Sequence, residues 1–318
     1  MSDVSRPGED RARPYAALVT VQVFFASLAV LGRLVLPEVG AGLLVTIRVF
    51  GAAVVLAAVA ALRGGRWITD GRTLGRLALS GLLGVTVNQS LFLYGLAHST
   101  AVNATILVTT APVFTVLGSL LLGLERPSPG KLAGIGLAAA GAIYLVGPER
   151  LTLTPGVALG NLAILIGMMA YAGYFLVSKP LVGKHDPLLV GAYVMGFAAV
   201  GLLPVAIPSV LAADPARVSR TAWALTAYIV AGPTIGSYFL NLWALRRASS
   251  NTVAAFIYLQ PFLAAVGSAL LLPQETLTGR TILAGVIIFT GLGLVLRAEA
   301  RTPRRGEGVS KLTPAQTS

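Results

Sequence analysis

Long apolar runs alternate with short polar connections along almost the whole chain. A helix needs roughly 20 residues to cross a hydrocarbon core that is ~30 Å thick. Runs of about this length lie near residues 15–35, 41–62, 74–96, 101–123, 131–147, 156–178, 188–210, 221–244, 252–272 and 281–297. Connections as short as HST indicate that consecutive helices are antiparallel neighbours. The pattern predicts an all-α integral membrane protein with ten transmembrane helices.

The composition agrees with this pattern, because 55% of the residues are hydrophobic and only 11% are charged. A soluble globular chain carries about 25% charged residues, and a soluble fold of 318 residues could not bury this much apolar surface. The sequence contains no cysteine, and its two histidines, His98 and His185, lie far apart. These counts exclude disulfides and thiolate metal sites, and we expect neither a metal nor a cofactor.

The chain has 24 basic and 12 acidic residues, which give a net charge of +12. The basic residues are dispersed between the apolar runs and do not form one face of a soluble domain. We therefore expect no nucleic-acid partner. If the N-terminus is cytoplasmic, 18 of them fall on the inner side, four on the outer side and two within the runs. The positive-inside rule then predicts cytoplasmic termini in a multi-pass protein of the cell inner (plasma) membrane. Residues 1–14 are the predicted N-terminal tail, and 299–318 a basic, disordered C-terminal tail.

A proline-containing motif occurs twice, at an offset of 149 residues. In TTAPVFTVLGS and YLQPFLAAVGS, Pro112 matches Pro261, and the Gly-Ser pair that ends each copy matches as well. The copies lie five runs apart, so the second would enter the membrane from the opposite side. This predicts two inverted five-helix repeats, 15–147 and 156–298, an arrangement found in many secondary transporters. Chance matches between lipid-facing segments are the alternative.

Three prolines interrupt runs that would otherwise form regular helices. Pro112 and Pro261 each remove one helical hydrogen bond and free a carbonyl one turn back, which is costly in lipid unless it faces a polar neighbour or a wet cavity. A third break, AGPTIG, contains Pro233, and the equivalent place in the third run contains Gly81 and Gly84. We expect these runs to bend and line a cavity, although a packing kink without a ligand would explain the same residues.

Polar and aromatic side chains inside the runs are the candidates for substrate binding. Amides and hydroxyls can bind a zwitterion or a sugar, and aromatic walls can hold an apolar or cationic body. The candidates are Gln22, Arg48, Asn88, Gln89, Tyr94, Thr109, Tyr171, Tyr174, Tyr238, Asn241, Trp243, Tyr258 and Gln260. For threonine, a bond back to its own helix is the alternative. For Tyr94 and Trp243, which lie near the ends of runs, it is an aromatic belt.

Arg48 lies about eight residues into the second run, roughly 12 Å along the helix. There it could bind a substrate carboxylate or phosphate, or extend outward toward Glu38. None of the twelve acidic residues lies in the middle of a run. Carriers coupled to protons or sodium usually keep a carboxylate near the midplane. The pattern therefore predicts facilitated diffusion, exchange, or coupling without a buried carboxylate.

The second motif and the Gly-rich run after it resemble the EamA-type permeases of the drug/metabolite transporter superfamily. The shared features are Pro261, Glu275 and the Gly-rich run, with Pro112 and Glu125 at the corresponding places of the first half. The segment TIRVF, which contains Arg48, resembles the Arg-Phe pair early in the second helix of such proteins, although a valine separates the two residues here. The resemblance extends over most of the chain, from about residue 15 to 298.

This resemblance implies a secondary, non-ATP transporter that works by alternating access between its repeats. The implied substrate is a small organic metabolite such as an amino acid or a related compound, with export as the expected direction. Similar proteins also handle sugars, nucleosides and drugs, so the substrate stays open. The expected partners are this small molecule and membrane lipid. The Gly/Ala-rich segments 134–142 and 285–293 would either close each repeat or form a homodimer contact.

An integral-membrane enzyme or a sensor without transport activity is the alternative function. An enzyme would need paired Asp-rich motifs, a metal-binding helix or a Ser/His pair, and the histidines and loop acids supply none of these. A sensor normally carries a soluble output domain, for which the loops and tails are too short. We therefore expect a protein that is not an enzyme.

Overall fold

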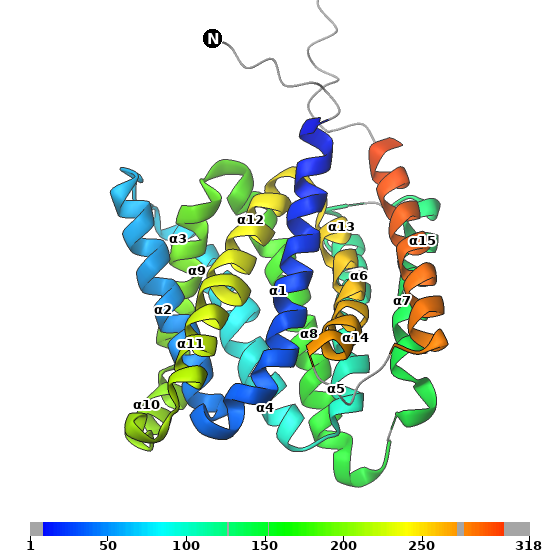
Figure 1. Ribbon diagram of the computed structural model, residues 1–318. Helices are drawn as coiled ribbons and strands as arrows, with labels where there is room; N and C mark the ends of the chain where they lie inside the picture. The colour runs from blue at the N-terminus through cyan, green and yellow to red at the C-terminus, as the bar shows by residue number, and fades with distance from the viewer. Residues whose placement is uncertain (1–8, 126, 152, 272–276, 302–318) are drawn as a thin grey trace, which may run out of the picture.

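The computed structural model describes residues 9–125, 127–151, 153–271 and 277–301, and Figure 1 shows them as helices joined by short connections. No strand occurs among these residues, so the all-α prediction is confirmed for the described part of the chain. Glu275, most of the predicted N-terminal tail and nearly all of the predicted C-terminal tail lie outside it.

The helical segments follow one another closely along the chain. Those of the first half are α1 (Glu9–Val39), α2 (Ala41–Leu62), α3 (Gly71–Gly81), η1 (Leu82–Val87), α4 (Asn88–Ala97), α5 (Ala101–Val108), α6 (Ala111–Leu121) and α7 (Pro129–Val146). Those that follow are η2 (Pro148–Arg150), α8 (Pro155–Lys184), α9 (Pro187–Gly201), α10 (Leu203–Leu211), η3 (Pro215–Arg217), α11 (Arg220–Ile229), η4 (Val230–Gly236), α12 (Ser237–Arg247), α13 (Ser250–Ala255), η5 (Phe256–Tyr258), α14 (Leu259–Leu271) and α15 (Gly279–Arg301). Segments η1 and η4 are π-helical, whereas η2, η3 and η5 are short 3-10 turns.

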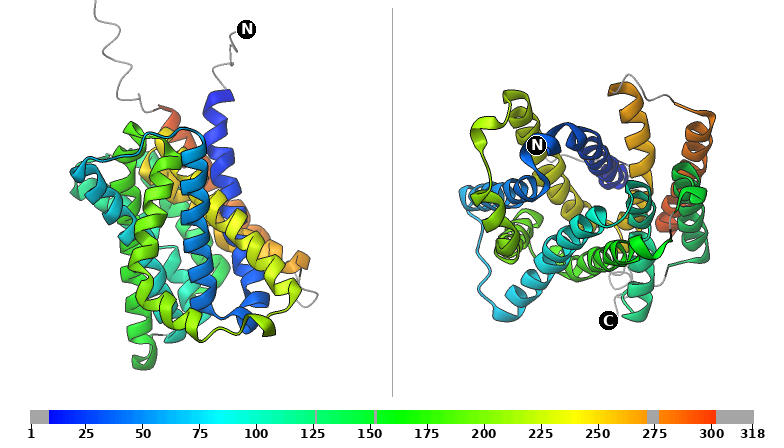
Figure 2. Two further views of the ribbon diagram at one scale, coloured as in Figure 1. Left: turned by 90° about the vertical axis from the view of Figure 1, so that its left-hand side faces the viewer. Right: turned by 90° about the horizontal axis from the view of Figure 1, so that it is seen from below.

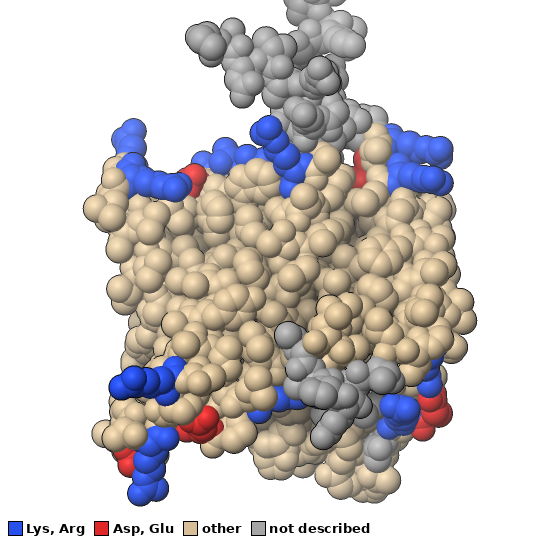
Figure 3. All heavy atoms as spheres, in the orientation of Figure 1, with Lys and Arg blue, Asp and Glu red and all other residues tan. Residues whose placement is uncertain are grey.

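Eight helices of the described chain are long and apolar enough to cross a membrane, and the pair α9–α10, bent by 66°, makes a ninth candidate. Lys and Arg side chains gather at the two ends of the helices and leave a broad uncharged band between them (Figure 3). Such a band matches the hydrocarbon core of a bilayer. The chain is therefore a multi-pass membrane protein.

The two halves of the chain run in opposite directions. Helix α1 starts at the end of the molecule where the N-terminus lies, whereas α8 starts at the opposite end, after the connection that follows α7 (Figure 1). The packing repeats in the same way: α1 packs against α12 and α14, and α8 packs against α4 and α6. The pairs α2–α9 and α7–α15 join equivalent helices of the two halves. This exchange of contacts is what an inverted repeat requires.

Helices α7 and α15 form a closely packed pair at one edge of the bundle (Figure 2). A Cβ atom on Gly134 would lie 2.7 Å from the carbonyl oxygen of Gly291, and one on Gly291 would lie 2.5 Å from the backbone nitrogen of Ala138. Only glycine allows backbones to approach so closely. The small-residue segments, for which closure of the repeats and dimerisation were alternatives, thus pack against each other within one chain.

An ion pair lies at each end of the α7–α15 pair, one between the two helices and the other between α15 and the turn η2 that follows α7. At the end where α7 begins, Lys131 contacts Glu299, and these side chains are only 7% and 17% exposed. At the opposite end, Arg280 contacts Glu149 at 2.7 Å, and these side chains are 30% and 58% exposed. Lys131 and Arg280 are equivalent at the offset of 149. The repeat therefore extends to the ends of the helices, with one pair buried and the other exposed.

The irregular segments also recur at this offset. The π-helix η1 of the first half corresponds to η4 of the second, which contains Pro233. Pro112 lies in the first turn of α6, after a turn at Thr109 and Thr110 that separates α5 from α6. Pro261 lies in the first turn of α14, directly after the 3-10 turn η5. In the described residues, each half thus has a π-helical segment and an interruption at its proline-containing motif.

Candidate functional site

Side chains from both halves meet in the interior of the bundle, on helices that the irregular segments interrupt. Most are buried, and they combine one charge with hydroxyls, amides and aromatic rings. We call this set the central cluster; its members are Arg48, Gln89, Tyr171, Tyr174, Thr234, Ser237, Tyr238 and Asn241. Arg48 lies on α2 and Gln89 on α4 of the first half, and the other members lie on α8, η4 and α12 of the second.

Arg48 connects the two halves. Its Nε–H donates to the Thr234 hydroxyl oxygen at 2.9 Å, and this hydroxyl donates to the carbonyl oxygen of Ile229 at 2.9 Å. The arginine is only 7% exposed. The alternative contact with Glu38 does not occur, because the Glu38 carboxylate accepts hydrogen bonds from the backbone nitrogen and hydroxyl of Ser219 at 2.7 and 3.1 Å. The guanidinium is therefore directed to the interior and not to the surface.

Three tyrosine rings form the aromatic part of the cluster. Tyr171 and Tyr174 stack with ring centroids 5.7 Å apart, and the centroids of Tyr174 and Tyr238 are 6.3 Å apart. The Tyr174 ring packs on Gly84 of η1, where an added Cβ atom would lie 2.5 Å from ring atoms. Glycine at this position lets a large ring from the second half pack directly on the backbone of the first.

Amide groups hold the hydroxyls of two of these tyrosines. The Tyr238 hydroxyl bonds to the Gln89 side chain and donates to the Gly84 carbonyl oxygen at 3.4 Å. The Tyr171 hydroxyl bonds to the side chain of Asn241. The contacts of Tyr238 join the two halves, so a movement of one half against the other must rearrange them, whereas Tyr171 and Asn241 both lie in the second half.

Four buried polar atoms have no hydrogen-bond partner among the described residues. They are Oε1 of Gln22 and the hydroxyl oxygens of Tyr174, Ser237 and Tyr258. Unpaired buried groups are rare in native proteins and each requires an explanation. Tyr174 and Ser237 belong to the central cluster, while Gln22 and Tyr258 lie on α1 and η5, which pack against each other. These atoms are available for a bound solute or water.

Two of the candidate residues that lie outside the cluster are aromatic side chains near helix ends. Tyr94 is 46% exposed and stacks on His98 with ring centroids 4.2 Å apart. Trp243 lies under the guanidinium of Arg247, which is 3.8 Å from its ring centroid. Both occupy the last turns of α4 and α12. Their positions correspond to the aromatic belt that was the alternative for them.

Three further candidates have local or structural contacts. The Thr109 hydroxyl donates to the Ile106 carbonyl oxygen of its own helix at 2.6 Å. The Asn88 amide donates to the Gly167 carbonyl oxygen of α8 at 3.0 Å, which joins the two halves. Gln260 is half-buried in the first turn of α14, one residue before the proline. Among the described residues, none of these three forms a hydrogen bond with Arg48 or with the tyrosines of the cluster.

The sequence analysis missed Thr234 and Ser237. Thr234 lies within AGPTIG, the segment that was selected only as a helix break, and Ser237 follows one turn later. It also missed polar contacts between the halves, such as the Asn161 side-chain oxygen, which accepts from Ser99 at 2.6 Å and Asn103 at 2.9 Å. A lone serine or threonine gives no signal that distinguishes such contacts from a bond to its own helix.

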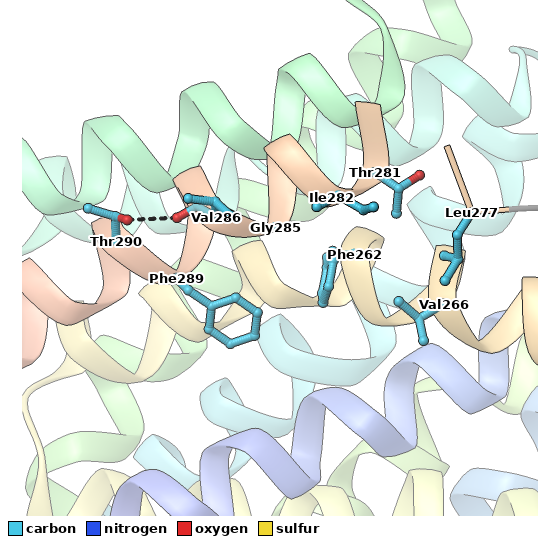
Figure 4. A pocket seen from close by; sticks show the side chains of 9 residues that line it. All are labelled: Phe262, Val266, Leu277, Thr281, Ile282, Gly285, Val286, Phe289 and Thr290. Carbon is cyan, nitrogen blue, oxygen red and sulfur yellow. Dashed lines mark hydrogen bonds between the residues drawn. The ribbon is translucent and has the colours of Figure 1, made fainter. Parts of the chain in front are cut away.

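Two surface cavities lie away from the cluster. One, of about 470 Å³, lies between α14 and α15 and is lined mainly by apolar side chains that include Phe262 and Phe289 (Figure 4). The other, of about 440 Å³, lies between the start of α7 and the end of α15. Neither is lined by a candidate site residue. Tyr174, Tyr238 and Asn241 are between 1% and 4% exposed, so this part of the central cluster is buried in this conformation.

Two related halves of opposite direction, with a polar and aromatic cluster between them, define a helical membrane protein built from an internal repeat. The EamA-like transporter family matches this chain twice, over residues 13–147 and 158–297. The chain therefore belongs to the EamA-like transporter family.

Similar proteins support this assignment. An uncharacterized transporter of Archaeoglobus fulgidus is 27% identical over 69% of this chain and 74% of its own length. A probable terminal-alkyne amino-acid exporter of Streptantibioticus cattleyicolor is 32% identical over 74% of this chain and 79% of its own. A protein crystal structure with 18% identity superimposes with a TM-score of 0.74 and covers 92% of this chain and 100% of that one. At this identity the last comparison shows a shared fold alone.

Proposed function

We propose that this protein moves small organic metabolites, such as amino acids or related compounds, by alternating access between its two inverted halves. The observation that carries the proposal is the central cluster, where Arg48 of one half bonds to Thr234 of the other. A buried group of convergent polar and aromatic side chains between helices is the usual form of a small-molecule site. Membership in a transporter family favours transport over a membrane enzyme or sensor.

The proposed topology has ten spans. Nine are the candidates described above. The additional one is the continuous segment Arg220–Arg247, formed by α11, η4 and α12, which holds polar residues of the site. We place both termini in the cytoplasm and the protein in the cell inner (plasma) membrane, because the split of 18 inner and four outer basic residues supports this orientation. The repeats are 15–147 and 156–298, flanked by tails 1–14 and 299–318, and a homodimer stays a prediction.

Export of an amino acid or a related compound is the proposed activity. The relative from Streptantibioticus cattleyicolor, named a probable terminal-alkyne amino-acid exporter, supports both the direction and the substrate class. The central cluster supports the substrate class through its amides, hydroxyls and guanidinium, which can bind the polar ends of such a compound. Its three tyrosine rings can pack against an apolar side chain.

Polar contacts between the halves occur at both ends of the molecule. At the end where α7 begins, the Glu125 carboxylate accepts hydrogen bonds from the backbone nitrogens of Ser250 and Asn251 at 2.7 and 3.3 Å. At the opposite end, Ser99 donates to Asn161 at 2.6 Å. Alternating access requires each set to open in turn. The π-helical segments η1 and η4 lie between the two sets and are the positions where the helices can bend.

Counterflow in proteoliposomes tests the proposed function. Vesicles loaded with one unlabelled amino acid at a time should accumulate the labelled form faster than empty vesicles for at least one compound. Asn241→Leu removes an amide of the site at similar volume and should reduce the rate at least about tenfold, as expected for loss of a buried hydrogen-bonding group. Thr290→Val is the control, because this exposed hydroxyl bonds only to the Val286 carbonyl of its own helix. No counterflow by the wild type would contradict the proposal.

The energy source is tested in the same vesicles. The acidic residues of the described chain lie at helix ends and in connections, and none lies in the middle of a helix. We therefore propose facilitated diffusion, exchange, or coupling without a buried carboxylate. Uptake in the presence of an imposed pH gradient should equal uptake without it when the membrane potential is clamped. Accumulation that follows the size of the pH gradient would contradict this assignment.

A further inference from the structure

The central cluster contains a buried positive charge without a counter-charge. A guanidinium has five N–H donors, and for Arg48 the hydroxyl oxygen of Thr234 accepts one of them. Within the described residues, no carboxylate forms an ion pair with this arginine, and the ion pairs that occur lie at helix ends. Buried charges are normally paired, since an unpaired one is costly. A bound anion would therefore stabilise this buried arginine.

The fold itself does not require the arginine. At the offset of 149, Arg48 of α2 corresponds to Phe197 of α9. The equivalence extends to the helix ends, because α2 ends at Leu62 and the bent α9–α10 pair ends at Leu211, 149 residues later. Phe197 packs against the apolar core beside Gly81 of α3. The packing is close, since a Cβ atom added to Gly81 would lie 3.3 Å from the Phe197 side chain. The same architecture thus accepts an apolar ring in one half and a charge in the other. The charge has to be explained by what the site binds.

The groups around Arg48 suit a carboxylate. Tyr238 lies on α12 and is buried in the same interior as Arg48. Ser237 precedes this tyrosine and is one turn from Thr234, and its buried hydroxyl has no partner among the described residues. A carboxylate accepts two parallel bonds from a guanidinium and further bonds from hydroxyls. The Tyr174 ring lies beside Tyr238, where it can cover the apolar part of the same molecule.

We propose that Arg48 binds the carboxylate of the transported solute, that the substrates carry one carboxylate next to an apolar or aromatic body, and that monoanions such as N-acyl amino acids are preferred to the zwitterionic amino acids. One buried positive charge is balanced by a monoanion, whereas a dianion such as a phosphate monoester would leave an excess negative charge at low dielectric. A compound without the carboxylate would leave the guanidinium unpaired. This assignment rests on the proposed transport function and specifies its substrate class.

Uptake from a defined mixture tests the assignment. Proteoliposomes are incubated with an equimolar mixture of N-acetylphenylalanine, its methyl ester, phenylalanine, phenylethylamine, phenyl phosphate and a complete set of central metabolites, and their contents are identified by mass spectrometry. Compounds that accumulate in wild-type vesicles above empty ones should carry a carboxylate, and N-acetylphenylalanine should exceed its ester. Arg48→Met should reduce their uptake at least about tenfold, equivalent to ~1.4 kcal/mol, and Arg48→Lys should restore part of it.

Three controls separate the explanations. Arg246→Met removes an exposed arginine at the end of α12 and should leave uptake unchanged. Unliganded Arg48→Met should melt at the wild-type temperature or higher, because the uncompensated charge is gone. A lower melting temperature together with unchanged uptake would show a structural arginine and overturn the proposal, as would accumulation of the ester, the amine or the phosphate as strongly as the acid. If wild-type vesicles take up nothing, the transport function itself fails, and the substrate assignment fails with it.

Discussion

The buried ion pair at one end of the α7–α15 pair provides a quantitative test of the packing. Lys131 contacts Glu299, and its ammonium also donates to the Ser249 hydroxyl at 3.0 Å. Lys131→Met keeps most of the apolar stem and removes the charge. Breaking a buried pair by removing one partner costs about 3–5 kcal/mol. Because Glu299 retains 17% exposure and two hydrogen bonds from Ser249, we expect a smaller effect than this, about 2–3 kcal/mol.

The assay is thermal unfolding in detergent, followed by tryptophan fluorescence, for a double-mutant cycle. At roughly 2–4 °C per kcal/mol for a large domain, Lys131→Met should lower the midpoint by about 5–10 °C. Glu299→Gln neutralises the carboxylate and can still bond to Ser249, so the double variant should be more stable than Lys131→Met alone. The coupling between the two positions should be about 1–3 kcal/mol.

The equivalent pair at the other end of the same helices is the matched control. Arg280, which is equivalent to Lys131 in the repeat, also pairs with a glutamate, but Arg280 and Glu149 are 30% and 58% exposed. Solvent screening weakens such a pair, so the coupling between Arg280→Met and Glu149→Gln should be smaller than the coupling at the buried end. Equal coupling at both ends, or additivity at the buried end, would refute the reasoning that burial decides the strength of the pair.

Two other predictions concern the same helices. Gly134→Leu places a Cβ atom 2.7 Å from a backbone oxygen of α15, and this overpacking should lower the free energy of unfolding by about 1–3 kcal/mol and with it the melting midpoint. A Cβ atom on Gly136 has no neighbour within 4 Å, so Gly136→Leu should leave the melting midpoint unchanged. Hydrogen bonding from Arg280 lowers the pKa of Glu149 from 4.5 to about 2. A lowered native pKa gives stability that is present above the unfolded value and lost as the pH falls toward the native one. The difference in midpoint between wild type and Glu149→Gln should therefore be constant above about pH 5 and shrink below pH 4.

The general architecture was predictable because a bilayer imposes simple rules on sequence. Backbone groups in hydrocarbon must be satisfied within the segment, so long apolar runs have to be helices. The offset of 149 predicted the inverted repeat from a few proline and glycine positions, and the same offset relates the two π-helices and the ion pairs of α7 and α15. Much of the central cluster could be selected from the polar side chains in the apolar runs, because an unpaired amide or charge in lipid is costly.

Which side chains contact each other in the folded protein, in contrast, could not be predicted from the sequence. Tyr94 and Tyr174 look alike in sequence, yet one is 46% exposed beside His98 and the other is 1% exposed on Gly84. Which one enters the interior depends on the rotation of its helix, and a π-helical turn changes that rotation within one helix. Thr234 could not be distinguished from other threonines until it faced Arg48.

By itself the sequence determined that the chain is an all-helical membrane protein with a repeat of opposite orientation, because hydropathy, charge bias and proline spacing are properties of single segments. Tertiary structure alone decided which candidates meet. It placed Arg48 against Thr234 and away from Glu38, brought three tyrosines of the second half together beside Gly84 of the first, and packed the glycines of α7 and α15 against each other. The physical reason is that a contact between distant segments depends on helix rotation and crossing, which the packing of all the helices sets together.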